Sequence, residues 1–289
     1  MTLGWLYVIL VLEQIVASGT FLAAKWALED FPPLTLAFLR FVIAAAGLYL
    51  VRWVWPRRKP IERRDWRTFA LLGFLAVMVN QAAFLYGLRL TTPTHAAIIY
   101  GATPVFVFLL AIPLLRERAT WLKFTGVIVT FAGVIVIVIG EGLSWAGKVW
   151  LGDLFILVAT GAWALYTVLG KPMVAKYGAV HTTAISLITG TVFFAPIGVF
   201  SWGDFSPTTV TSGGWYSLLY IAIGTSVICY TIWFWALGRL EATKVAVFNN
   251  FQPVITALLS LWLMDEAFGA RLIAGGLLVI FGVILTERG

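Results

Sequence analysis

The chain has 289 residues, of which 61% are hydrophobic and only 11% are charged, and its formal net charge is +7. Its mean hydropathy is +0.95. Soluble globular chains are about 45–50% apolar and about 25% charged, so this composition argues against a water-soluble enzyme or a nucleic-acid binder. The single cysteine, Cys229, excludes an internal disulfide, and no cluster of Cys and His residues predicts a zinc site.

Ten apolar runs follow one another along the chain, and each approaches or exceeds the ~20 residues of a membrane-spanning helix. The runs are continuous rather than alternating at period two, which favours helices over strands. They lie at 3–28, 33–54, 67–89, 93–115, 120–140, 150–171, 180–201, 213–239, 242–264 and 268–287. We therefore predict an all-α integral membrane protein with ten transmembrane helices.

The basic residues of the short loops indicate the orientation, because Lys and Arg concentrate in cytoplasmic loops. Most of the 20 Lys and Arg residues fall in the even-numbered loops, with a dense stretch from Arg52 to Arg67. The odd-numbered loops hold only Arg89, Lys148 and Arg271. Both termini are therefore predicted to be cytoplasmic. Binding of anionic lipid is a second interpretation of the basic stretch.

An internal repeat relates the two halves of the chain. The stretch beginning LYGLRLTTPTHAAIIYGATP and the stretch beginning FWALGRLEATKVAVFNNFQP align without a gap. A mid-helix proline, a loop glutamate and two glycines recur at an offset of 149 residues, namely Pro104 and Pro253, Glu117 and Glu266, Gly126 and Gly275, and Gly133 and Gly282. We place the first repeat at 1–145 and the second at 146–289.

Each repeat contains five predicted helices, and this odd number requires the two repeats to lie upside down relative to each other. The loops agree, since RER after the fourth helix is basic and DEA after the ninth is acidic. Inverted repeats are an architecture of secondary transporters, in which the substrate site lies near the membrane midplane between the halves.

The pattern resembles the drug/metabolite transporter superfamily, and specifically its EamA type with two five-helix units. The residues that carry the resemblance are the segment EDFPPLTLAFLRF, from Glu29 to Phe41, and the two repeated stretches. Arg40 matches the family's arginine in the second helix. Among relatives, the ten-helix size and the aromatic-rich helices are most similar to the aromatic amino acid exporters called YddG.

This resemblance implies a secondary transporter that exports aromatic or neutral amino acids, or related small metabolites, across the bacterial inner membrane by alternating access. Sister groups carry other substrates, so efflux of a drug or another metabolite stays an alternative. Proton-coupled and facilitated transport both stay open. The expected partners are a small-molecule substrate and the lipid bilayer, with no nucleic acid and no cofactor, and the protein is a monomer or a homodimer.

The first predicted helix carries a polar and aromatic stripe that includes Gln14, Phe21 and Lys25 on one face. An offset of 142 residues, which aligns Gly19 with Gly161, places Trp163 of the sixth helix opposite Phe21. Polar side chains within a bilayer tend to face a cavity or a partner helix. We interpret the two stripes as walls of a cavity; helix packing is the alternative.

The fourth and ninth helices provide a second matched set. Tyr100 and Thr103 correspond to Asn249 and Gln252, each pair at a spacing of three residues and just before Pro104 or Pro253. A proline inside a helix removes a backbone hydrogen bond and frees a carbonyl. Freed carbonyls in a membrane are found where they line a cavity, so these helices are predicted to kink beside the site; a kink that serves only helix packing is the alternative.

Four more polar and aromatic residues complete the predicted ring. Asn80 and Gln81 lie in the third helix, about 100° apart, so only one of them is expected to face inward. Tyr230 and Trp233 lie in the eighth helix at the same spacing as Trp163 and Tyr166 in the sixth. We expect these rings to stack on an aromatic substrate and the amides to bind its amino and carboxylate groups; rings that only fill the core are the alternative.

Three charged residues lie within the helices. Glu13 is the deepest acid and either carries a coupling proton or stays neutral and hydrogen-bonded. Arg40 either holds a substrate carboxylate or braces helices, and Lys25 is expected to pair with Glu29 at i+4.

Two other protein classes compete with a transporter. An intramembrane enzyme requires a nucleophile with a base, or a metal site, and the predicted helices contain neither motif. A non-transporting membrane protein requires no polar midplane and no inverted repeat. Glycine pairs at a spacing of seven, Gly126 with Gly133 and Gly275 with Gly282, predict close helix approach, either within each half or in a dimer.

Overall fold

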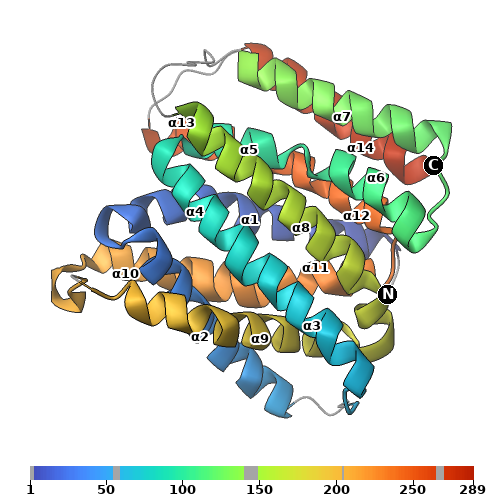
Figure 1. The fold of residues 1–289 in the computed structure, drawn as a ribbon. Helices are drawn as coiled ribbons and strands as arrows, with labels where there is room; N and C mark the ends of the chain where they lie inside the picture. Colours follow the sequence, from blue (N-terminus) through green and yellow to red (C-terminus); the bar gives the residue numbers. More distant parts are fainter. Residues whose placement is uncertain (1–2, 55–58, 140–148, 204, 265–269) are drawn as a thin grey trace.

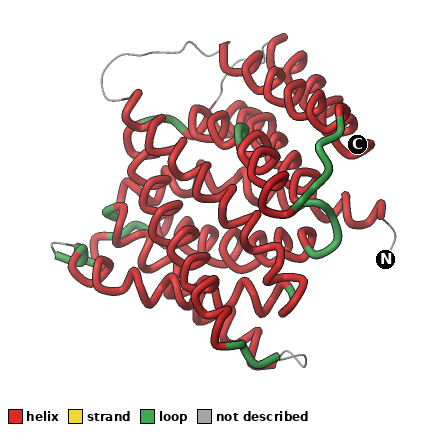
Figure 2. Tube along the Cα trace, turned by 45° about the vertical axis from the view of Figure 1, so that its right-hand side comes forward, coloured by secondary structure: helices red, strands yellow, loops and turns green. Residues whose placement is uncertain are grey.

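The computed structural model describes residues 3–54, 59–139, 149–203, 205–264 and 270–289. Within these residues all regular structure is helical and no strand forms, as Figures 1 and 2 show. The predicted all-α class is therefore confirmed. The expected boundary between the two repeats, at 145 and 146, lies outside the described residues.

Fourteen α-helices make up the described part of the chain, joined in places by short turns of other helix types. Their bounds are α1 (Leu3–Asp30), α2 (Pro33–Val54), α3 (Trp66–Gly73), α4 (Asn80–Leu90), α5 (Pro93–Tyr100), α6 (Thr103–Leu115), α7 (Trp121–Ile139), α8 (Val149–Tyr177), α9 (Ala179–Phe200), α10 (Ser212–Leu219), α11 (Tyr230–Leu237), α12 (Ala242–Val247), α13 (Phe251–Met264) and α14 (Ala270–Arg288).

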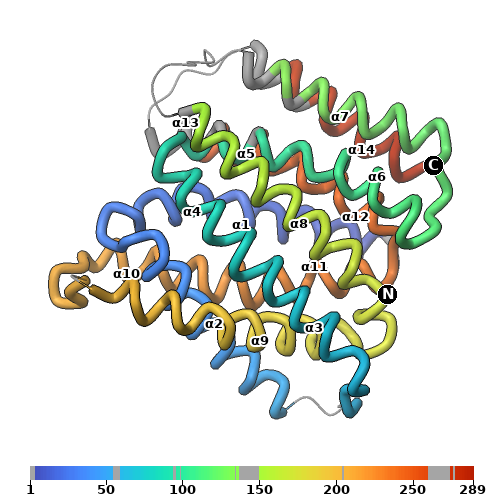
Figure 3. The backbone as a smooth tube through the Cα atoms, viewed as in Figure 1, coloured from blue at the N-terminus to red at the C-terminus, as the bar shows by residue number. Residues whose placement is uncertain are grey.

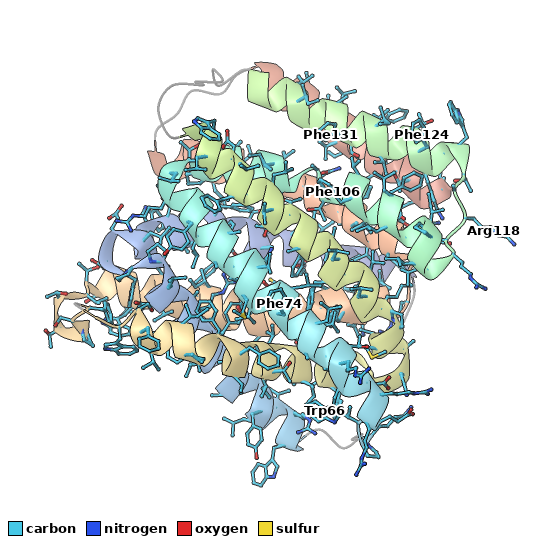
Figure 4. The ribbon with its side chains drawn as sticks, viewed as in Figure 1. Trp66, Phe74, Phe106, Arg118, Phe124 and Phe131 are labelled. Carbon is cyan, nitrogen blue, oxygen red and sulfur yellow. The ribbon has the colours of Figure 1, made fainter. Side chains whose placement is uncertain are left out.

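Six helical spans in the described residues are long and apolar enough to cross a membrane by length and composition. They are Gly4–Asp30, Pro33–Val54, Arg63–Leu90, Trp150–Tyr177, Ala179–Phe200 and Ser212–Leu237. Shorter apolar helices lie at Thr103–Leu115 and Trp121–Gly133. Many large apolar side chains on these helices are exposed on the outside of the bundle, as expected for surface that contacts lipid. Figure 4 shows Trp66 and Phe124 on that outer surface.

Local sequence signals set several helix ends. Pro33 begins α2, where its fixed φ suits a first helical turn and its missing N–H costs nothing. Thr211 precedes α10, and its hydroxyl accepts a hydrogen bond from the N–H of Gly214 at 3.0 Å. Gly178 separates α8 from α9 with φ +84°, a conformation that favours glycine.

Two predicted single helices are interrupted at equivalent places. The predicted run 93–115 forms α5 and α6, with a turn at Gly101 and Ala102. The predicted run 242–264 forms α12 and α13, separated by the 3₁₀ turn η5 (Phe248–Asn250). Both interruptions lie just ahead of the repeated prolines.

Two wide π-helical segments also recur. The segment η2 (Phe74–Val79) joins α3 to α4, and η4 (Tyr220–Cys229) joins α10 to α11. The offset of 149 residues carries the whole of η2 onto positions within η4. Such segments are rare in helices and occur often at functional sites. Here they end directly before Asn80 and Tyr230, two residues of the predicted ring.

The glycine seam lies between α7 and α14. A Cβ on Gly282 would approach the carbonyl oxygen of Gly126 to 2.7 Å, and one on Gly133 would approach that of Gly275 to 2.7 Å. The two backbones are therefore in direct contact, and Figures 1 and 3 show the helices side by side at one edge. The seam joins the two halves of one chain, rather than helices within one half, because each helix supplies one glycine pair.

The first helix occupies the centre of the bundle. Figure 1 shows α1 passing between the other helices, and it packs against α4, α5, α11 and α13. It also contacts η4, so elements of both halves surround it. Polar residues in the middle of α1 are therefore placed where the two halves meet.

Candidate functional site

A cavity of about 60 Å³ lies at the centre of the bundle, beside α1. This space admits a few water molecules. Its lining comes from nine helices and turns and consists of Glu13, Ala17, Thr20, Phe21, Arg40, Gln81, Phe84, Tyr100, Trp163, Thr225, Cys229, Tyr230, Asn249 and Gln252. Entry of a solute larger than a few waters requires side chains or helices to move apart.

Seven of the predicted site residues line this cavity: Phe21, Gln81, Tyr100, Trp163, Tyr230, Asn249 and Gln252. Two of the three predicted charged residues, Glu13 and Arg40, line it as well. The other five predicted residues lie behind the lining, where they contact residues that form it: Gln14, Asn80, Thr103, Tyr166 and Trp233.

One wall of the cavity is a cluster of aromatic rings from α8 and α11. The ring of Trp163 lies 4.7 Å from that of Tyr230, centroid to centroid. Behind it, Tyr166 lies at 5.3 Å and Trp233 at 5.7 Å from the same indole. Because Trp233 donates a hydrogen bond from Nε1 to Thr167 Oγ1 at 3.0 Å, the backing rings are fixed in place. Trp163 and Tyr230 are the two residues of this cluster that line the cavity.

A second aromatic group, from α1, α4 and α5, forms another wall of the cavity. Phe21, Phe84 and Tyr100 meet edge to face, with centroids 5.6–5.8 Å apart. Edge-to-face contacts in this range are favourable. Two walls of rings can therefore enclose an apolar or aromatic group.

A chain of hydrogen bonds starts at Arg40, whose guanidinium is buried. Its Nη1 donates to Gln81 Oε1 at 2.5 Å, and its Nε donates to Ser226 Oγ at 2.8 Å. Gln81 Nε2 in turn donates to Asn80 Oδ1 at 2.7 Å. Asn80 Nδ2 donates to Tyr100 Oη at 2.5 Å. We call Arg40, Gln81, Asn80 and Tyr100 the arginine chain.

The sequence predicted that only one of Asn80 and Gln81 faces inward. Gln81 lines the cavity, whereas Asn80 lies behind it and also donates to the carbonyl of Ala159 at 2.8 Å. Asn80 thus links α4 to α8 and holds the Tyr100 hydroxyl.

A second chain runs between α13 and α1. Gln252 Nε2 donates to Gln14 Oε1 at 2.9 Å, and Gln14 Nε2 donates to Glu13 Oε2 at 2.5 Å. We call Glu13, Gln14 and Gln252 the glutamate chain. Two of the buried polar atoms around the cavity, Gln252 Oε1 and Asn249 Nδ2, have no hydrogen-bond partner within the described residues.

The break ahead of Pro104 does not expose the carbonyl that the proline frees. Proline at 104 removes the N–H that the carbonyl of Tyr100 would otherwise accept from. Thr103 Oγ1 donates to this carbonyl at 2.6 Å. Thr103 therefore satisfies the backbone of the break and does not line the cavity.

Lys25 and Lys171 make the same contact in the two halves. Lys25 Nζ donates to the carbonyls of Leu88 and Thr91, at 2.8 and 2.7 Å. Lys171 Nζ donates to the carbonyls of Leu237 and Leu240. The offset of 149 residues relates these acceptors pairwise, 88 to 237 and 91 to 240. Both ammonium groups thus cap a helix C-terminus, where a cation is stabilising.

This equivalence changes the register expected for the first helix of each half. Lys25 and Lys171 are 146 residues apart, whereas the sequence suggested an offset of 142. The counterpart of Trp163 is then Ala17 rather than Phe21, and both Ala17 and Trp163 line the cavity. A shift of four residues is close to one helical turn and leaves the same face inward, so the face pattern alone could not distinguish the two offsets.

Five lining residues were absent from the predicted set: Ala17, Thr20, Phe84, Thr225 and Cys229. Phe84 had a signal, because the offset of 149 pairs it with the predicted Trp233. Thr20 and Thr225 bond to each other through their hydroxyls at 2.6 Å. Small hydroxyl residues recur throughout these helices, so nothing local separates this pair from the others.

The repeated loop glutamate has a structural partner. Glu117 accepts hydrogen bonds from the N–H of Ala242 at 2.5 Å and from Thr243 Oγ1 at 2.9 Å. A carboxylate at a helix N-terminus satisfies free N–H groups and complements the helix dipole. Nearby, Lys123 and Glu241 form an ion pair. The predicted counterpart, Glu266, lies outside the described residues.

The sequence matches the EamA-like transporter family over residues 4–139 and again over residues 150–288. Similar proteins include an uncharacterized transporter of Archaeoglobus fulgidus, 33% identical, covering 97% of this chain and 96% of that protein. The uncharacterized transporter YyaM of Bacillus subtilis is 30% identical, over 98% and 93% of the two chains.

A third relative carries a more specific name. A probable terminal-alkyne amino-acid exporter of Streptantibioticus cattleyicolor is 27% identical, over 96% of this chain and 92% of that protein. A solved crystal structure superposes with a TM-score of 0.76 at 20% identity, covering 96% of this chain and 95% of the other. That superposition shows a shared fold.

Proposed function

The chain belongs to the EamA-like transporter family, and from this premise we propose that it exports aromatic or other neutral amino acids, or closely related metabolites. It is a multi-pass membrane protein, and its relatives are transporters rather than enzymes. Its substrate is a small molecule, and the lipid bilayer is its surroundings. We place it in a bacterial inner membrane with both termini in the cytoplasm.

The observation that carries this proposal is the mixed lining of the central cavity. Trp163 and Tyr230 contribute rings from α8 and α11, while Phe21 and Tyr100 contribute rings from α1 and α5. Arg40 and amide groups from both halves line the same space. A neutral amino acid combines an apolar side chain with one positive and one negative group, and this lining offers matching surfaces for all three.

We further propose ten membrane-crossing helices in two inverted repeats, 1–145 and 146–289. Two matches to one family, the recurring π-helical segments and the equivalent contacts of Lys25 and Lys171 support this arrangement. Inverted repeats permit alternating access by rocking of one half against the other around a fixed site. The cavity lies between elements of both halves, as this mechanism requires.

The relative named as a probable terminal-alkyne amino-acid exporter supports the amino-acid assignment. Efflux of an apolar drug is a second candidate, which the two aromatic walls favour. The buried side chains of Glu13 and Arg40 favour the amino acid, because an uncharged drug supplies neither of them with an opposite charge. Glu13 also lies where a coupling proton could be carried, which a pH gradient across liposomes would test.

Counterflow in proteoliposomes tests the proposal directly. Vesicles preloaded with unlabelled phenylalanine should accumulate external labelled phenylalanine, and vesicles preloaded with glutamate or lysine should not. Chloramphenicol, an uncharged aromatic drug, serves as the drug probe in a parallel counterflow with its own label, and liposomes without protein provide the background. Counterflow of chloramphenicol without counterflow of phenylalanine would replace amino-acid export with drug efflux.

A further inference from the structure

Two buried charges line the cavity without touching each other. The side chain of Glu13 is 5% exposed and that of Arg40 is 1% exposed. No ion pair joins them among the described residues. The hydrogen-bond partners of Arg40 are neutral side chains, Gln81 and Ser226, and Glu13 accepts from the neutral amide of Gln14. A buried charge that lacks an opposite charge is costly, so a ligand that supplies both signs gains from both.

The two hydrogen-bond chains have opposite polarity. The arginine chain begins with a guanidinium, which can only donate, and its donors point from Arg40 through Gln81 towards Asn80. The glutamate chain ends at a carboxylate, which accepts, and its donors point from Gln252 through Gln14 to Glu13. One chain therefore places a donor group beside the cavity, and the other places an acceptor group there.

Two buried polar atoms of cavity-lining residues have no hydrogen-bond partner among the residues described. Gln252 Oε1 is an acceptor within the glutamate chain, and it has no partner in the part of the chain that the structure describes. Asn249 Nδ2 is a buried donor that also has no partner within the described residues. Both residues line the cavity. Unsatisfied buried polar atoms cost free energy, and a ligand with donors and acceptors at opposite ends satisfies them.

We propose that the cavity binds both charged groups of a zwitterionic α-amino acid, with Arg40 holding the carboxylate and Glu13 holding the ammonium. Gln252 Oε1 accepts a second hydrogen bond from the ammonium, and Asn249 Nδ2 donates to the carboxylate. The side chain of the substrate lies between the aromatic walls. This inference rests on the proposed function, and it makes Glu13 a binding group for substrate rather than only a carrier of protons.

The experiment uses three ligands that share one side chain. Phenylalanine carries both charges, phenethylamine lacks the carboxylate, and 3-phenylpropionate lacks the ammonium. Each is measured for binding to the full chain in detergent, by quenching of tryptophan fluorescence. Removing either charged group should weaken binding to the unaltered protein by about 10- to 100-fold, the range for hydrogen bonds to charged groups.

Variants then assign each group to its residue. Glu13→Gln should weaken phenylalanine and phenethylamine by about tenfold or more and leave 3-phenylpropionate unchanged. Arg40→Gln should weaken phenylalanine and 3-phenylpropionate and leave phenethylamine unchanged. Glu29→Gln, an exposed acid farther along α1, is the matched control and should change none of them.

The outcomes separate the inference from the function on which it rests. If the unaltered protein binds and transports phenylalanine, but Glu13→Gln weakens all three ligands equally, the pairing of Glu13 with the ammonium is overturned and the proposed function stands. If the unaltered protein neither binds nor transports phenylalanine, both are overturned. If Arg40→Gln fails to fold, Arg40→Lys replaces it. The binding of the three ligands to the unaltered protein is a second test, and equal affinity for all three ligands overturns the assignment.

Discussion

The breaks ahead of Pro104 and Pro253 occupy equivalent positions in the two halves, yet their side chains do different things. In the first half, Thr103 donates to the carbonyl of Tyr100, and the Tyr100 hydroxyl accepts from Asn80. In the second half, Gln252 Oε1 and Asn249 Nδ2 remain without partners in the described residues. Two similar breaks in the backbone thus carry polar side chains with different hydrogen bonding.

The two equivalent segments therefore differ in how their polar groups are satisfied. In the first break, polar groups bond to the break's own backbone and to a neighbouring helix, which stabilises the fold. In the second break, two polar atoms of cavity-lining residues have no partner in the described residues, and they are available to a ligand. We therefore expect substitutions at the shared scaffold to affect stability, and substitutions at the second break to affect transport.

The largest effect is expected where the two halves touch. A Cβ on Gly282 would lie 2.6 Å from the backbone nitrogen of Thr130 and 2.7 Å from the oxygen of Gly126. Backbone atoms cannot turn aside, so Gly282→Ala should lower the free energy of unfolding by about 3 kcal/mol, the upper end for overpacking. Thermal melting in detergent measures this.

Gly161→Ala is the matched control, because a Cβ there meets nothing within 4 Å. In a helix this change should stabilise by up to about 1 kcal/mol. Equal melting temperatures for the two variants would show that α7 and α14 are not held in backbone contact.

The next effect tests the equivalence of the two halves. Lys25→Met and Lys171→Met each remove charge-assisted hydrogen bonds to a pair of helix-terminal carbonyls. Each should lower the free energy of unfolding by about 1.5–3 kcal/mol, and by similar amounts. The exposed Arg63→Met serves as control. A large loss in one variant alone would break the proposed symmetry of these contacts.

Much of the fold could be predicted from the sequence, because apolar runs and prolines act locally. The breaks near Pro104 and Pro253 follow from the proline ring, and η2 and η4 show that the repeat extends to helix geometry. What could not be predicted depends on contacts between distant segments. The α7–α14 seam is one case, because a glycine pair indicates close approach without naming its partner.

The candidate site shows the same division. Residues with distinctive side chains, such as Gln81, Trp163 and Asn249, were predicted and line the cavity. Thr20 and Thr225 line it through a contact that joins α1 to η4, 205 residues apart. The pairing of Lys25 with Glu29 was expected from their spacing of four residues in one helix. In the structure, the Lys25 ammonium donates to carbonyls at the end of α4. Local sequence patterns do not show which distant residue a side chain contacts.

A smaller effect compares the two breaks themselves. Gln252→Leu keeps the volume but removes the unpartnered Oε1 and the Nε2 that donates to Gln14, so counterflow of phenylalanine should fall by about tenfold. Its counterpart Thr103→Val loses the bond to the Tyr100 carbonyl, and should lower the melting temperature while changing counterflow by less than about twofold. Equal losses of counterflow in both variants, at matched amounts of folded protein, would contradict the proposal that the first break stabilises the fold and the second acts in transport.

The smallest effect concerns the aromatic wall, and it also compares the two halves, because Trp163 corresponds to Ala17. The indole lies 4.7 Å from Tyr230 and forms one face of the cavity. Stacking between aromatic groups contributes about 0.5–1.5 kcal/mol beyond the burial of area, which corresponds to a change of about 2- to 13-fold in transport efficiency. Trp163→Ala should therefore reduce counterflow of phenylalanine within this range and change that of alanine less, since alanine has no ring to stack.

The Trp163 indole packs against Tyr166 and Trp233, so its loss also leaves space in the core. Thermal melting must therefore accompany the transport measurement. If counterflow of phenylalanine and of alanine falls equally in folded protein, Trp163 is a packing residue, and a preference for aromatic substrates would have to come from the other aromatic group, which contains Phe21 and Tyr100.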